Sequence, residues 1–96
     1  MWVSQARKRG VVMNYPNEKR DEYIEKLTEE LPVLRARLHI SQGELARDVG
    51  ISRQTYSLLE TGKQKMTWIT FMAMIAYFSS HAKTRKDLKA LGLIDD

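Results

Sequence analysis

The 96 residues include no cysteine and two histidines, which excludes disulfides, thiol nucleophiles, thiolate zinc sites and a three-histidine metal site, so we expect neither a metal nor a cofactor. Hydrophobic residues at 43% and charged residues at 29% are typical of a globular chain, and the length suits one domain. The 16 Lys and Arg residues outnumber the 12 Asp and Glu residues, and the net charge of +4 favours an anionic partner.

The chain begins with a segment that has no helical or strand pattern. Residues 1–17 contain Gly10, Pro16 and a basic triplet, so we expect a flexible basic arm before a single domain over residues 18–96. From residue 19 onward, apolar residues recur at steps of three and four as far as Leu38, which predicts a long amphipathic helix. Pro32 removes one backbone hydrogen bond, so a kink or a break into two helices is expected near Glu30.

Two short helices are predicted next. Ser41 and Glu44 form a capping box for a helix over residues 42–49, and Gly50 ends that helix by taking a left-handed conformation. A third helix follows over residues 53–60. Two short helices joined by a tight turn define a helix-turn-helix. The residues with the spacing that buries the facing sides of such a pair are Leu45, Ala46, Val49, Ile51, Tyr56 and Leu59.

Two further helices complete the chain. Thr67 caps a fourth helix over residues 68–80, and Thr84 opens a short fifth helix that ends at Gly92. The fourth helix is apolar nearly all round, so its surplus apolar surface needs a cover. We expect a homodimer in which this helix, from Trp68 to Phe78, and the C-terminal helix bury against a second copy. The first and fifth helices of the same chain are the alternative cover.

A set of residues around the two short helices is typical of one family of regulators. The set comprises Leu34-Arg35, Ser41-Gln42 with Glu44-Leu45-Ala46, Gly50-Ile51-Ser52-Arg53-Gln54-Thr55, Leu59-Glu60 and Gly62-Lys63. Over residues 34–78 the chain thus resembles the Cro/repressor-type (XRE-like) helix-turn-helix family of bacterial and phage regulators. Gly43 departs from the helix-forming residue usual there, and Tyr56 replaces a smaller aliphatic residue. The resemblance implies an all-α bundle of five or six helices, of the lambda-repressor-like DNA-binding type.

The third helix is expected to read DNA. Its outward face is centred on Gln54, Leu58 and Thr61, and the N-terminal end of such a helix enters the major groove. Side chains there match base edges, as Gln54 does with adenine and Arg53 with guanine. The expected base contacts are Arg53, Gln54, Ser57 and Leu58. The expected phosphate contacts are Gln42, Ser52, Thr61, Lys63, Lys65 and Arg47.

The sequence leads to one main functional hypothesis. Arg35 and Glu60 match a structural pair of the family, which joins the first helix to the end of the recognition helix. We expect a sequence-specific double-stranded DNA-binding regulator, a dimeric repressor on an inverted-repeat operator, with no catalytic residues. The longest nearly apolar run is too short to cross a membrane, and a secretory segment is missing, so the cytoplasm is expected. The alternatives are an antitoxin-type regulator with a toxin partner, or a helix-turn-helix fold used only as a protein-interaction module.

Overall fold

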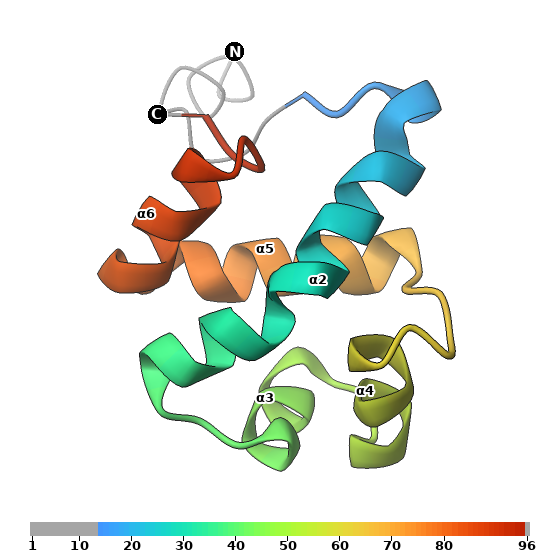
Figure 1. Ribbon diagram of the computed structural model, residues 1–96, viewed down its shortest axis with the longest axis vertical. Helices are drawn as coiled ribbons and strands as arrows, with labels where there is room; N and C mark the ends of the chain where they lie inside the picture. The colour runs from blue at the N-terminus through green and yellow to red at the C-terminus, as the bar shows by residue number, and fades with distance from the viewer. Residues whose placement is uncertain (1–13, 96) are drawn as a thin grey trace, which may run out of the picture.

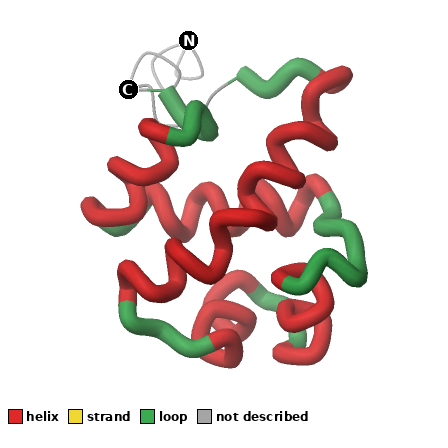
Figure 2. Tube along the Cα trace, viewed as in Figure 1, coloured by secondary structure: helices red, strands yellow, loops and turns green. Residues whose placement is uncertain are grey.

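The computed structural model describes residues 14–95, and within that range all regular structure is helical (Figures 1 and 2). The predicted all-α bundle is therefore confirmed for this part of the chain. Residues 1–13, which carry most of the predicted basic arm, and residue 96 lie outside the described residues. The elements in chain order are the 3₁₀ turn η1 (Asn17–Lys19) and the helices α2 (Arg20–Leu38), α3 (Gln42–Val49), α4 (Arg53–Glu60), α5 (Trp68–Ser79) and α6 (Ala82–Ala90).

Helix α2 passes through Pro32 without a break, so of the predicted kink or break near Glu30 the division into two helices is wrong. The apolar stripe explains the continuity, because its members on both sides of the proline are buried against α4, α5 and α6. Tertiary packing of an apolar face, rather than local propensity, supplies most of the stability of a helix in a protein. Here it outweighs one missing backbone hydrogen bond. The buried members are Ile24, Leu27, Leu31 and Leu34.

The helix-turn-helix forms as the local signals predict. Ser41 Oγ accepts a hydrogen bond from the backbone N–H of Glu44 at 3.0 Å, and the backbone N–H of Ser41 donates to Glu44 Oε1 at 2.9 Å, so the capping box is confirmed. Gly50 ends α3 with a φ of 85°. Ser52 caps α4 by accepting from the N–H of Thr55. Figure 1 shows α3 and α4 side by side at one end of the molecule, below α2.

Helix α5 crosses behind α2 in Figure 1 and packs against α2, α3 and α6. The ring of Phe71 is fully buried, and Trp68 stacks on it with 4.5 Å between ring centroids. Ile69, with 83% of its surface exposed, is the most exposed of the large apolar residues described. The surplus apolar surface of α5 is therefore mostly covered within the chain, as the alternative to the dimer expects.

Tyr15 is half-buried and packs against the core, although the sequence places it in the flexible arm. Its ring lies edge-on against Tyr23, Trp68 and Phe71, with centroid distances of 5.1, 5.3 and 5.4 Å. Its hydroxyl donates to the carbonyl of Leu93 at 2.6 Å. Burial raises the pKa of Tyr15 to about 12. The two ends of the described chain are thereby joined.

Helix α6 begins at Ala82, two residues before the predicted start, so the assignment of Thr84 as its opening residue is wrong. Thr84 is fully buried, and its hydroxyl donates to the carbonyl of Phe78 at 2.6 Å. This bond fixes α6 to the end of α5. Among residues 14–95, none of the helices combines the length and the apolar character that crossing a membrane requires.

Candidate nucleic-acid interface

Helix α4 presents two different faces. Tyr56 and Leu59 point inward and are 0% and 2% exposed. The outward side carries Arg53 and Gln54, which are exposed, and Leu58, whose exposed fraction is 39%. The fourth residue predicted to contact bases, Ser57, is half-buried. Three of the four predicted base contacts are therefore exposed on one side of α4.

The predicted phosphate-binding cations, on α3 and after α4, are all exposed. Lys63 is exposed and follows the end of α4, where its backbone N–H donates to the carbonyl of Leu58 at 2.9 Å. Lys65 pairs with Asp21 of α2. Arg47 lies 3.4 Å from the carboxylate of its neighbour Asp48. Exposed pairs of this kind contribute little to stability, so both cations can exchange their partner for a phosphate at small cost.

Two predicted phosphate contacts have hydroxyls that already donate within α4. Ser52 Oγ donates to Thr55 Oγ1 at 2.9 Å besides accepting the capping bond. Thr61 Oγ1 donates to the carbonyl of Ser57 at 3.0 Å. A phosphate contact from either side chain would have to replace one of these bonds. Ser52 and Thr61 are therefore weaker candidates for phosphate contacts than Lys63, whose ammonium has no hydrogen bond or ion pair within residues 14–95.

A carboxylate at the end of α4 connects three helices. Glu60 accepts from Nε and Nη2 of Arg35 at 2.9 and 3.0 Å, from the hydroxyl of Tyr56 at 2.7 Å, and from Nε2 of Gln42 at 2.6 Å. Arg35 also donates from Nη1 to the carbonyl of Ile40 at 3.2 Å. These side chains come from α2, α3 and α4, and Figure 1 shows α3 and α4 below α2. The network fixes the recognition helix to its supports.

The network keeps Glu60 charged and neutralises it locally. Its side chain is only 8% exposed, and burial alone would raise the pKa of this carboxyl. The hydrogen bonds from Arg35, Tyr56 and Gln42 outweigh burial, so the pKa of Glu60 lies below its usual value. The hydrogen bond between Arg35 and Glu60 raises the pKa of Arg35. Burial raises the pKa of Tyr56, and the hydrogen bond from Tyr56 to Glu60 raises it further. The one acidic residue of α4 therefore presents no free charge to a phosphate backbone.

The sequence pairs Arg35 with Glu60 but does not reveal the other two members of the network. Tyr56 stands four residues before Glu60 on one helix, a spacing that brings side chains together, so its unusual size was a usable signal. Gln42 is 18 residues from Glu60, and only the tertiary packing brings the two together. Gln42 was expected at a phosphate. With one amide hydrogen given to Glu60, it keeps its second amide hydrogen and its backbone N–H at the start of α3 for that contact.

Comparison with known proteins agrees with this geometry. Residues 34–72 match a family model described as Helix-turn-helix, and the match runs from the end of α2 through α3 and α4 into α5. No curated protein and no solved structure matches the chain. The match supports a DNA-binding helix-turn-helix module of the kind found in regulators. Over these residues the chain is similar to the Cro/repressor-type (XRE-like) helix-turn-helix family.

Proposed function

We propose that this helix-turn-helix regulator binds one particular sequence of double-stranded DNA by placing the outward face of α4 in the major groove, and that it acts as a dimeric repressor on an inverted repeat. The observation that carries the proposal is the exposure of Arg53 and Gln54 at the N-terminal end of α4, where such helices meet base edges. The opposite face of the helix is held by the core and by Glu60, so the reading face has a defined orientation.

The exposed side chains suit particular chemical groups of the bases. The amide of Gln54 can pair with N6 and N7 of adenine, and the guanidinium of Arg53 can pair with O6 and N7 of guanine. Leu58 offers an apolar surface for the methyl group of thymine. Lys63, directly after the recognition helix, supplies charge to the backbone without reading sequence. The proposal therefore separates residues that specify sequence from one that positions the protein.

Two substitutions test this division. Sites would first be selected from a random DNA pool, and affinity for a selected site and for random DNA would then be measured by fluorescence anisotropy at several salt concentrations. Gln54→Ala should lose about 1–3 kcal/mol on the selected site and relax the preference at one base pair per half-site. Lys63→Ala should lower the affinity equally for both DNAs and make the log-log salt slope shallower by about 0.9.

Arg85→Ala serves as the matched control, because it removes an exposed positive charge from α6, which does not carry the reading face. Its affinity for the selected site should stay close to that of the unchanged protein. Equal weakening of selected and random DNA by Gln54→Ala would refute the recognition-helix assignment. A folded protein that binds no DNA at all would support the protein-interaction module instead.

Much of the surface expected for the dimer on α5 is used within one chain. Phe71, Met74, Ile75 and Phe78 of that helix are completely buried in one chain. Ile69 is the large apolar residue of α5 that remains exposed, and Trp68, Met72 and Tyr77 are half-buried, so the apolar surface left on α5 for a second copy is small.

A further inference from the structure

The outward side of α2 carries a row of side chains four residues apart. Glu25, Glu29, Val33 and Arg37 follow one another at this spacing, which aligns them along one ridge of a helix. All four are exposed, and half of the surface of Val33 is open to solvent. Within residues 14–95, neither glutamate has a hydrogen bond or an ion pair. Along the ridge, two unpaired glutamates are thus followed by an apolar residue, Val33, and then by a cation, Arg37.

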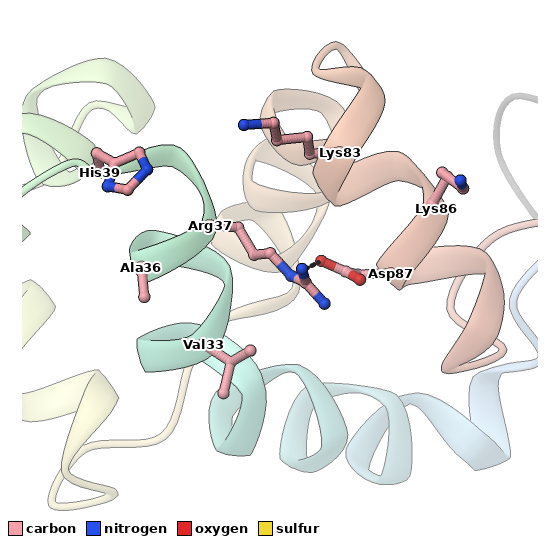
Figure 3. A pocket seen from close by; sticks show the side chains of 7 residues that line it. All are labelled: Val33, Ala36, Arg37, His39, Lys83, Lys86 and Asp87. Atoms are coloured by element: carbon pink, nitrogen blue, oxygen red, sulfur yellow. Dashed lines mark ion pairs between the residues drawn. The ribbon is translucent and has the colours of Figure 1, made fainter.

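A basic groove extends the C-terminal end of this ridge. It lies between α2 and α6 and has a volume of about 630 Å³ (Figure 3). Its residues are Val33, Ala36, Arg37, His39, Lys83, Lys86 and Asp87. Arg37 Nε lies 3.1 Å from Asp87 Oδ2, and the two lysines are exposed without a partner among the described residues. The groove thus holds three cations and one carboxylate, which leaves an excess of positive charge.

The ridge is arranged so that a twofold rotation matches its charges. Glu29 lies four residues before Val33 and Arg37 lies four residues after it, which places each about 6 Å from Val33 along the helix axis. A twofold axis that passes near Val33, perpendicular to α2, brings Glu29 of one copy opposite Arg37 of the other. Glu25 is then carried toward the lysines of the partner's groove. Each contact occurs twice, as in an isologous interface.

We propose that the outward ridge of α2 and the α2–α6 groove form the interface between two antiparallel copies of this chain. The ridges of two helices with four-residue spacing interdigitate in the commonest mode of helix packing. The proposal rests on the dimeric part of the proposed function and is independent of how α4 reads DNA. No residue of α3 or α4 lines the groove, so the interface leaves the reading face free.

A second copy fits this surface better than DNA or an acidic peptide. Either of those partners would neutralise Lys83 and Lys86 but would leave Glu25 and Glu29 unpaired on the same face, where they would repel a phosphate or a carboxylate. A second copy satisfies both signs of charge with one contact and also covers Val33. Small apolar area and exposed charges predict a weak dimer that dissociates as salt is raised.

The test uses charge reversal and its reciprocal rescue, measured by sedimentation without DNA at low salt. One variant carries Lys83→Glu and Lys86→Glu, and the other carries Glu25→Lys, so that the contact between Glu29 and Arg37 is left unchanged in both. The unchanged chain should show a reversible dimer. Each variant alone should dimerise at least about tenfold more weakly, because like charges then face each other. A mixture of the two variants should form a heterodimer, because both contacts regain opposite charges.

Two controls accompany the charge reversals. Arg85→Glu reverses a charge on α6 outside the groove and should leave the dimer unchanged, while circular dichroism checks that every variant is folded. A chain that stays monomeric at high micromolar concentration, variants that dimerise as well as the unchanged protein, or a mixture without heterodimer would overturn the inference.

Binding to a single half-site separates the failure of this inference from that of the proposed function. If the chain binds a half-site with base preference but forms no such dimer, the interface is wrong and the reading by α4 stands. If the dimer forms and the chain binds no half-site, the interface stands and the reading by α4 is wrong. A third outcome is that Lys83→Glu with Lys86→Glu weakens half-site binding while the sedimenting species stays the same as for the unchanged protein. In that case the groove contacts phosphates, and the inference is refuted.

Discussion

Replacing Glu60 by glutamine should show how much the three-helix network contributes to stability. The change keeps the size of the side chain but removes its charge and turns one acceptor oxygen into a donor. That amide nitrogen would face Arg35 or the amide of Gln42, which both donate to Glu60 at 2.6–3.0 Å. A lost partner in a buried ion pair costs about 3–5 kcal/mol. Arg35 keeps 21% of its side chain exposed and can be hydrated, so we expect about 2–3 kcal/mol.

The assay is urea denaturation followed by circular dichroism, with melting as a second measure. A loss of this size in a chain of 96 residues lowers the melting temperature by roughly 10–20 °C. Glu18→Gln, which alters an exposed carboxylate in η1, is the control and should stay within about 0.5 kcal/mol of the unchanged protein. If Glu60→Gln costs no more than Glu18→Gln, the network does not support α4.

Glu60→Gln should also change how the stability of the protein depends on pH. Because the pKa of Glu60 is lower in the folded protein than in the unfolded chain, its contribution is complete above the ordinary carboxyl pKa of about 4.3 and is lost as the pH falls through the folded value. The unchanged protein should therefore lose stability more steeply than Glu60→Gln below about pH 4.5. Parallel pH profiles for the two proteins would contradict this reasoning.

Four further substitutions, which make three predictions, are measured by the same denaturation assay. Gly50→Ala should destabilise the protein by about 1–2 kcal/mol because of its φ of 85°; a clash does not contribute, since no atom lies within 4 Å of the new Cβ. Gly43→Ala inside α3 should stabilise the protein by about 0.5–1 kcal/mol. Thr84→Val should cost about 1–3 kcal/mol by leaving the buried Phe78 carbonyl without its 2.6 Å donor. Tyr15→Phe should cost about 0.5–1.5 kcal/mol through the lost bond to Leu93.

Each of these three predictions has an outcome that would contradict it. Equal signs for the two glycine substitutions would show that backbone conformation does not decide their effect. A cost below about 0.5 kcal/mol for Thr84→Val would mean that α6 is fixed by packing alone. No change in Tyr15→Phe would mean that the hydroxyl finds an equally good partner in water when the chain unfolds.

The parts of the structure that depend on near neighbours could be predicted from the sequence. The capping box of Ser41 and Glu44, the end of α3 at Gly50 and the starts of α4 and α5 rest on contacts within a few residues, and all occur as expected. The outward face of α4 follows from helix geometry once its bounds are known. For this reason the segment that carries the proposed reading face was the most predictable part of the chain.

Features that depend on distant residues were decided by the tertiary structure. Pro32 stays within one helix because residues far along the chain bury the stripe on both sides of it, and Tyr15 joins the core because Trp68 and Phe71 lie there to receive it. Thr84 does not cap α6 but binds the carbonyl of Phe78, because the end of α5 lies beside it. The same packing brings Gln42 to Glu60. Local energies set where helices begin and end, whereas contacts between elements set which side chains are buried or left exposed.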